Sequence, residues 1–180
     1  MNIDDALKAA SESGDQPKYS LRSVDSLEED VRQALLKILE RGSKSTSVIR
    51  SALLAKEHPV ELVDQLIARF QQVGLIDDFV LAKDIAEQLF TRKSQAKKMI
   101  AIALREKGFA SDAIEYAIAD LDSDAELESA KALAVARISR MQALDSEARS
   151  RKLAGFLSRK GYSSTVVWAA IRFASDQLSA

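Results

Sequence analysis

The sequence has no cysteine, only two prolines and six glycines, and a single histidine among its 180 residues. Without cysteine, the chain forms neither disulfide bonds nor thiolate metal sites. Few prolines and glycines favour helices. No apolar run approaches the roughly 18 residues of a membrane span, and the first 25 residues lack the apolar core of a signal peptide. The simplest interpretation is a bacterial-type cytoplasmic protein that makes no membrane contact.

Residues that could carry out chemistry are also scarce. The single histidine, His58, lies before Pro59 in a short connection, where we expect it to face solvent. The pair Asp77-Asp78 is a better helix cap than an acid/base pair, because neighbouring side chains at a helix start point in different directions. There is no glycine-rich phosphate loop, and no residues have the spacing of a metal site. We therefore predict no catalytic residue, no metal and no cofactor, and we expect that the protein is not an enzyme.

The most informative feature present is an internal repeat. Its first strong copy ends in Lys107-Gly108-Phe109, and 53 residues later the second ends in Lys160-Gly161-Tyr162. In both copies apolar residues stand three and seven positions before the lysine, at helical spacing. A weaker third copy, shifted by 51 residues upstream of the first, has Glu57-His58 where the others have glycine and an aromatic residue. Repetition at a fixed period is typical of helical-repeat proteins.

No segment alternates with period two, so we predict an all-α fold of three tandem three-helix repeats, with about nine helices in an elongated, curved body. The predicted domains are a disordered N-terminal tail (1–25) and repeats over 26–74, 75–122 and 123–180. The residues predicted to form the repeat corners are Gly74, Asp77, Asp78, Gly108, Phe109, Gly161 and Tyr162.

Several local features carry their own predictions. Ser26 and Glu29 have the spacing of a capping box, and Thr46 is a candidate cap for the second helix. The spacings of Trp168, Phe173 and Phe156 are typical of core residues rather than of a platform for bases. Gly155 lies inside a predicted helix. Either a neighbour approaches its backbone closely, or the glycine arose by sequence drift and is tolerated without a structural role.

The charges are unevenly distributed along the chain. The net charge is −1, with 11 basic and 16 acidic groups in residues 1–90 against 15 and 11 in residues 91–180. Charge runs are usually solvated helix faces, but those in the second half also suit phosphate or an acidic protein surface. The candidate partner-binding residues are Lys97, Lys98, Arg105, Arg149, Arg151, Lys152 and Arg159.

The run Gly74-Leu75-Ile76-Asp77-Asp78, with Ala82 four residues later, and the two Lys-Gly-aromatic turns together resemble the RecX family of recombinase regulators. The resemblance extends from about Leu27 to Phe173, although the family usually has phenylalanine at the place of Leu81. It implies a crescent of three triple-helix repeats that binds the RecA recombinase. The protein would lie in the groove of the RecA filament on single-stranded DNA and inhibit its ATPase and strand-exchange activities, a role in DNA repair and homologous recombination.

Two other classes of function remain open. Triplets of short helices with tight turns resemble helix-turn-helix DNA-binding units, although a dedicated DNA-binding protein is more often clearly basic. The chain is also compatible with a generic helical-repeat scaffold for another protein. We expect a monomer whose main partner is the RecA filament, with DNA as a secondary contact.

Overall fold

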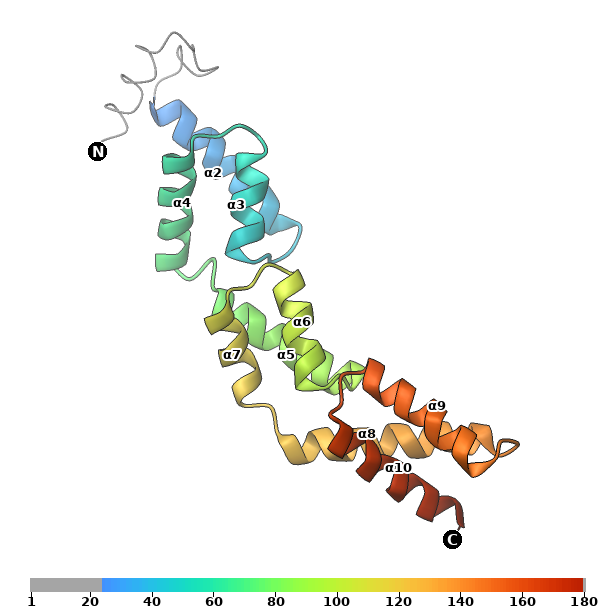
Figure 1. Cartoon of the computed structure of the whole chain (residues 1–180). Helices are drawn as coiled ribbons and strands as arrows, with labels where there is room; N and C mark the ends of the chain where they lie inside the picture. Colours follow the sequence, from blue (N-terminus) through green and yellow to red (C-terminus); the bar gives the residue numbers. More distant parts are fainter. Residues whose placement is uncertain (1–23, 180) are drawn as a thin grey trace. The chain divides into compact units, whose positions relative to one another are not determined.

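The computed structural model describes residues 24–179, which form nine α-helices and one short 3-10 turn, with no strand in that part of the chain (Figure 1). The prediction of an all-α fold is therefore confirmed. The chain divides into two compact units, Met1–Leu81 and Ala82–Ala180. Of the predicted tail, residues 1–23 lie outside the described part, whereas Val24 and Asp25 already belong to a helix.

The first unit contains α2 (Val24–Glu40), α3 (Thr46–Leu54) and α4 (Val60–Gln72), which pack against one another (Figure 1). Each helix turns an apolar stripe inward, as its 3.6-residue spacing predicts. The most deeply buried side chains are Val31, Leu35, Ile49, Leu53 and Val63. These five residues, drawn from all three helices, form the centre of a single apolar core.

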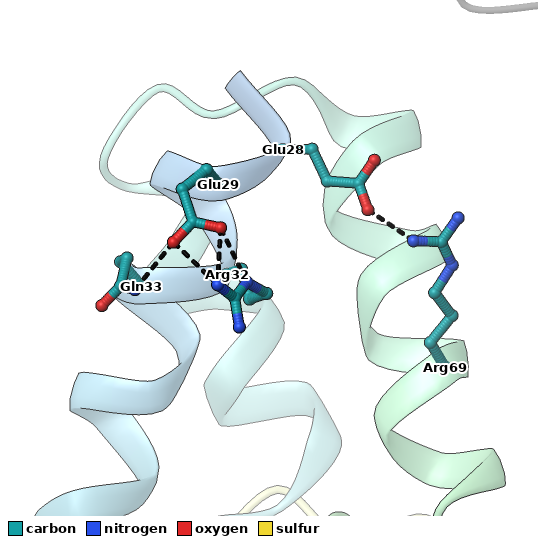
Figure 2. A network of polar contacts seen from close by, with 5 residues as sticks. All are labelled: Glu28, Glu29, Arg32, Gln33 and Arg69. Atoms are coloured by element: carbon teal, nitrogen blue, oxygen red, sulfur yellow. Dashed lines mark hydrogen bonds and ion pairs between the residues drawn. The ribbon is translucent and has the colours of Figure 1, made fainter. Parts of the chain in front are cut away.

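The start of α2 differs from its prediction. Ser26 lies inside the helix, two residues after its first residue Val24, so Ser26 and Glu29 do not mark the helix start. The Glu29 carboxylate instead accepts hydrogen bonds of 2.8 Å from Arg32 and Gln33, one turn further on (Figure 2). These hydrogen bonds, from Gln33 first and Arg32 second, lower the pKa of Glu29.

Ion pairs join the helices of the first unit at its surface. Glu28 on α2 pairs with Arg69 on α4 (Figure 2). Arg50 on α3 makes two hydrogen bonds, of 2.7 and 3.1 Å, to the carboxylate of Asp64 on α4. The Arg50 hydrogen bonds lower the pKa of Asp64. Exposed pairs of this kind contribute little stability each, so the apolar core is the main source of stability.

The helix α5 (Asp78–Lys93) begins in the first unit and continues into the second. The second unit also contains α6 (Lys97–Glu106), α7 (Ser111–Ala119), α8 (Ser123–Ile138), the 3-10 turn η1 (Ser139–Met141), α9 (Ser146–Arg159) and α10 (Ser164–Ser179). The last three α-helices pack together, and α6 packs against α7. Ile100, Leu104, Leu153 and Leu157, the apolar residues of the repeated motif, are all fully buried.

The repeat corners share one backbone motif. At Gly108 and Gly161, φ is +81° and +90°, and each glycine N–H donates to the carbonyl three residues earlier. The N–H of the aromatic residue that follows, Phe109 or Tyr162, donates to the carbonyl five residues earlier. Gly74 has the same pair of bonds with φ of +73°. This is the Schellman C-cap, which favours glycine because φ is positive.

The corner of the first copy has the same geometry without a glycine. Glu57 has φ of +63° at the place that aligns with Gly108, and its N–H donates to Leu54 O, again three residues earlier. The next residue, His58, aligns with the buried Phe109 and is itself half-buried, with an Nδ1 atom that lacks a hydrogen-bond partner. The expectation that His58 faces solvent is therefore wrong, and its burial lowers its pKa.

The helices α3, α6 and α9 are the middle helices of the three repeats. In α3 and α6, the backbone N–H of the first residue donates a hydrogen bond to a carboxylate on a later helix. Thr46 begins α3 rather than capping it: its N–H donates to Asp78 Oδ1 at the start of α5, over 2.9 Å. The N–H of Lys97, at the start of α6, likewise donates to Glu126 Oε1 on α8, over 3.3 Å. The third middle helix, α9, is capped locally by Asp145, whose Oδ1 accepts from Ala148 N over 2.7 Å.

The adjacent aspartates at the start of α5 have separate structural tasks. Asp77 Oδ1 accepts the N–H groups of Phe79 and Val80, at 2.9 and 3.0 Å, and so caps α5. Asp78 reaches α3 instead. Neither geometry is that of an acid/base pair.

Candidate functional site

The seven candidate partner-binding cations lie on two helices of the second unit. Lys97, Lys98 and Arg105 belong to α6, and Arg149, Arg151, Lys152 and Arg159 belong to α9 or to its C-terminal end. Five of the seven are exposed, and Lys97 and Arg149 are half-buried. Most of these charges are therefore presented to solvent, where a partner could reach them.

A surface cavity of about 630 Å³ brings the start of α6 next to the corner between α9 and α10. Its lining residues are Lys97, Lys98, Met99, Glu126, Ser158, Gly161, Tyr162, Ser163, Ser164 and Val166. The structure thus places two of the candidate lysines beside the last repeat corner. The other five candidates do not line the cavity: Arg105, Arg149, Arg151, Lys152 and Arg159.

The two lysines of the cavity differ in their contacts. Lys97 Nζ donates to Ser123 Oγ over 3.3 Å, while the Lys97 N–H reaches Glu126. Lys98 is exposed. Because Lys97 and Glu126 hold the start of α6 and the start of α8 together, Lys98 is the more available of the two charges.

Hydrogen bonds hold the last corner against the loop between α5 and α6. Ala96 N donates to Lys160 O over 3.1 Å, and Lys160 Nζ donates to Lys93 O over 2.5 Å. The Tyr162 hydroxyl donates to Ser94 O over 2.8 Å. Burial, with a contribution from the charge of Glu126, raises the pKa of Tyr162 to about 12. The hydroxyl therefore remains a donor throughout the physiological pH range.

Gly161 packs unusually closely against α6. A Cβ atom on Gly161 would lie 2.4 Å from Met99 Cγ, 3.0 Å from Met99 Cβ and 3.1 Å from Met99 N. The positive φ and this contact each disfavour any other residue there. At Gly74, by contrast, a Cβ would meet no atom within 4 Å, so only φ restricts the residue type.

Gly155, in the middle of α9, has no such internal neighbour. A Cβ there would meet only the Nη1 atom of Arg159, at 3.4 Å, which is ordinary van der Waals contact with a flexible side chain. Of the two explanations left open by the sequence, close approach by another part of the described chain is therefore wrong. Arg151 and Arg159, four residues before and after Gly155, lie on the same helix face.

The sequence did not predict the exposed aromatic residues correctly. Trp168 is 56% exposed and Phe173 is 39% exposed, so neither is a core residue. Phe156 is half-buried, and the Arg137 guanidinium carbon lies 4.2 Å from the centre of its ring. Lys131 Nζ lies 5.1 Å from the ring centre of Phe173. Phe156 nevertheless packs against the core of the second unit, as its spacing predicted. The rings of Phe156 and Phe173 both lie under cations.

Within residues 24–179 no three histidine, cysteine or acidic side chains gather as metal ligands would. Over the same residues no helix is both long and apolar enough to span a membrane.

Comparison with known proteins gives concordant results. A family model described as the third three-helix domain of RecX matches residues 124–171. The regulatory protein RecX of Streptomyces coelicolor is 32% identical over 149 residues, which cover 83% of this chain and 79% of the relative. The regulatory protein RecX of Thermobifida fusca is 27% identical over 163 residues, covering 91% of this chain and 88% of the relative.

Two solved structures have a similar fold. A crystal structure of RecX from Lactobacillus salivarius matches with a TM-score of 0.79 at 17% identity, over 84% of this chain and 99% of that one. A crystal structure of a regulatory protein RecX matches with a TM-score of 0.70 at 23% identity, over 92% of this chain and 78% of that one. At these identities the likeness concerns the fold alone.

Proposed function

The chain belongs to the RecX family, and on this premise we propose that it binds the RecA recombinase in its filament on single-stranded DNA and lowers the ATPase and strand-exchange activities of that filament. The observation that carries the proposal is the identity to relatives named regulatory protein RecX, over most of both chains.

The proposed contact uses the cations of the second unit. Lys97 and Lys98 beside the cavity, Arg105 at the far end of α6, and the basic residues of α9 suit an acidic protein surface or nearby phosphates. Separate basic clusters would contact successive protomers along the filament groove. A regulator that bridges protomers favours one filament geometry over another.

The proposed inhibition follows from differential affinity. A ligand shifts a conformational equilibrium only if it binds one state more tightly than the other. The protein would therefore bind more tightly to a filament state that is unfit for ATP turnover than to the active state. Its role requires contact alone, so no residue is assigned to catalysis and no cofactor is involved.

The three repeats (26–74, 75–122 and 123–180) serve in this proposal as a cytoplasmic, monomeric scaffold. The corner residues Gly74, Gly108, Phe109, Gly161 and Tyr162 would keep the helices of each repeat at a fixed angle. Asp77 and Asp78 would do the same at the start of α5.

The test is a RecA ATPase assay on single-stranded DNA with this protein at substoichiometric concentration. We expect the wild type to inhibit ATP hydrolysis. A variant with Lys97→Glu, Lys98→Glu, Arg151→Glu and Arg159→Glu should lose most of the inhibition and keep its helical circular dichroism. The control Arg41→Glu/Lys44→Glu reverses two exposed charges of the first unit and should inhibit like the wild type. No inhibition by the wild type would refute the proposal.

Direct contact with DNA is the second candidate function, and the exposed Trp168 favours it. Arg172, one turn later on α10, is also exposed, and an aromatic ring beside a cation is suited to stacking on an unpaired base. If the protein bound bare DNA as its main ligand, its affinity should fall steeply with salt, in proportion to the number of phosphates contacted.

A further inference from the structure

Gly155 lies near the middle of α9 (Ser146–Arg159), where glycine destabilises a helix relative to alanine. Packing inside the described chain does not require it, because a Cβ would meet only the Arg159 guanidinium. The Cβ direction is therefore open, and a methyl group would fit there. Gly155 is half-buried, with the flexible Arg159 guanidinium over it, and it has no side chain of its own between the helix backbone and a partner.

The surroundings of Gly155 are strongly basic. Arg151 and Arg159 stand one turn before and one turn after it, and Lys152 stands three residues before it, all three exposed. Arg151 has one weak partner, Glu147, whose oxygen lies 3.6 Å from Arg151 Nη1 with both side chains largely exposed. Within residues 24–179 no carboxylate forms an ion pair with Lys152 or Arg159. We call these four residues the Gly155 face.

We propose that the Gly155 face binds an acidic segment of a protein partner. The backbone of the segment would lie against Gly155, and its carboxylates would pair with Arg151, Lys152 and Arg159. Arginine is suited to this role because its guanidinium group binds a carboxylate with two parallel hydrogen bonds. The inference rests on the proposed function for the identity of the partner, the recombinase, and on the described residues for its chemistry.

The charges of α9 favour discrete carboxylates over a continuous phosphate backbone. Asp145 and Glu147 lie at the start of the same helix, and the Glu147 side chain is 81% exposed beside Arg151. A polyanion that ran along the whole helix would meet both acidic groups, whereas a short acidic segment centred on Gly155 would compete only with Glu147, for Arg151. The chain as a whole is also slightly acidic, with a net charge of −1, which disfavours general binding to nucleic acid.

The test uses the full-length protein, labelled with ¹⁵N, titrated at low salt with an octaglutamate peptide and separately with an oligothymidylate of equal charge. Amide shifts on adding the peptide should concentrate on residues 151–159. Gly155→Leu should weaken peptide binding at least tenfold by occupying the open backbone. Gly155→Ala should weaken binding less and raise the midpoint of thermal unfolding. The control Ala132→Leu introduces the same side chain at an exposed position of α8 and should bind like the wild type.

Three results would overturn the inference: peptide shifts that lie elsewhere, Gly155→Leu binding as tightly as the wild type, or tighter binding of the oligonucleotide than of the peptide to this face. Failure of this inference is distinguishable from failure of the proposed function. Peptide binding at the Gly155 face without inhibition of the RecA ATPase supports the acidic-segment chemistry of this face and refutes the proposed function, with the recombinase as the partner. Inhibition by the wild type without peptide binding at this face refutes the inference alone.

Discussion

Replacement of Gly161 by alanine should destabilise the second unit far more than replacement of Gly74 by alanine destabilises the first unit. Both glycines have positive φ, +90° and +73°, and both end a helix with the same pair of backbone hydrogen bonds. They differ in what an added methyl group would meet. At Gly74 there is no atom within 4 Å, whereas at Gly161 three atoms of Met99 lie within 3.1 Å.

The magnitude can be built from two contributions. The left-handed conformation costs alanine about 1–2 kcal/mol, and this contribution applies to both sites. Overpacking costs about 1–3 kcal/mol more and applies only to Gly161. Met99 Cγ could rotate away, but Met99 N and Cβ are fixed to α6, so the helix itself would have to move. We therefore expect a loss of about 1–2 kcal/mol for Gly74→Ala and about 2–5 kcal/mol for Gly161→Ala.

The assay is urea denaturation followed by circular dichroism at 222 nm, with the double variant Met99→Ala/Gly161→Ala to complete a cycle. Removing Met99 Cγ should recover part of the cost, because Met99 Cβ and N stay in place. The close-contact argument fails if Gly161→Ala is no more destabilising than Gly74→Ala, or if the cycle shows no coupling between positions 99 and 161.

Three further predictions concern the ends of helices. Glu57→Gly should stabilise the first unit by about 1 kcal/mol in urea denaturation, because glycine relieves the positive φ of +63°; an unchanged midpoint would mean that Glu57 is not strained. His58→Phe should stabilise by roughly 1 kcal/mol, because it removes the buried, unpartnered Nδ1 atom. Burial holds the native pKa of His58 below 6.5, so the wild type should reach full stability above pH 6.5 and lose some as pH falls from there towards the native pKa; a variant that keeps this pH dependence would exclude His58 as its source. The backbone N–H of Ala148 lowers the pKa of Asp145 below 3.8, so the contribution of this cap is present above pH 3.8 and lost as pH falls through the native pKa. Asp145→Asn keeps the acceptor without titrating, and acid unfolding should be less steep in this variant; identical acid titrations would contradict the role of the carboxylate.

The sequence predicted the helices because their apolar spacing is local information. Leu153 and Leu157, for example, are buried where the repeat places them. Glycine followed by an aromatic residue also predicted the corners, since a helix that ends in a Schellman motif needs positive φ at one residue. Glu57 escaped prediction because a glutamate rarely has that conformation, and only the alignment with Gly108 pointed to it.

Features that depend on distant residues could not be predicted. The caps from Asp78 to Thr46 and from Glu126 to Lys97 join residues 32 and 29 positions apart, which no local pattern reveals. The spacing of apolar residues along α10 is compatible with Trp168 on either the core side or the solvent side of the helix. Its exposure therefore depends on how α10 packs against its neighbours. For the candidate binding residues, the sequence supplied the list of cations. The structure shows that two of them, Lys97 and Lys98, line the same cavity.

In the proposed function this protein acts by contact with a recombinase filament. The decisive measurement is the binding of fluorescently labelled protein to RecA-coated single-stranded DNA and to bare single-stranded DNA across a range of salt concentrations. We predict at least tenfold tighter binding to the coated DNA at every salt concentration, and weak binding to bare DNA. Equal or tighter binding to bare DNA, with an affinity that falls by a slope of about 0.7 per phosphate contacted, would contradict the claim.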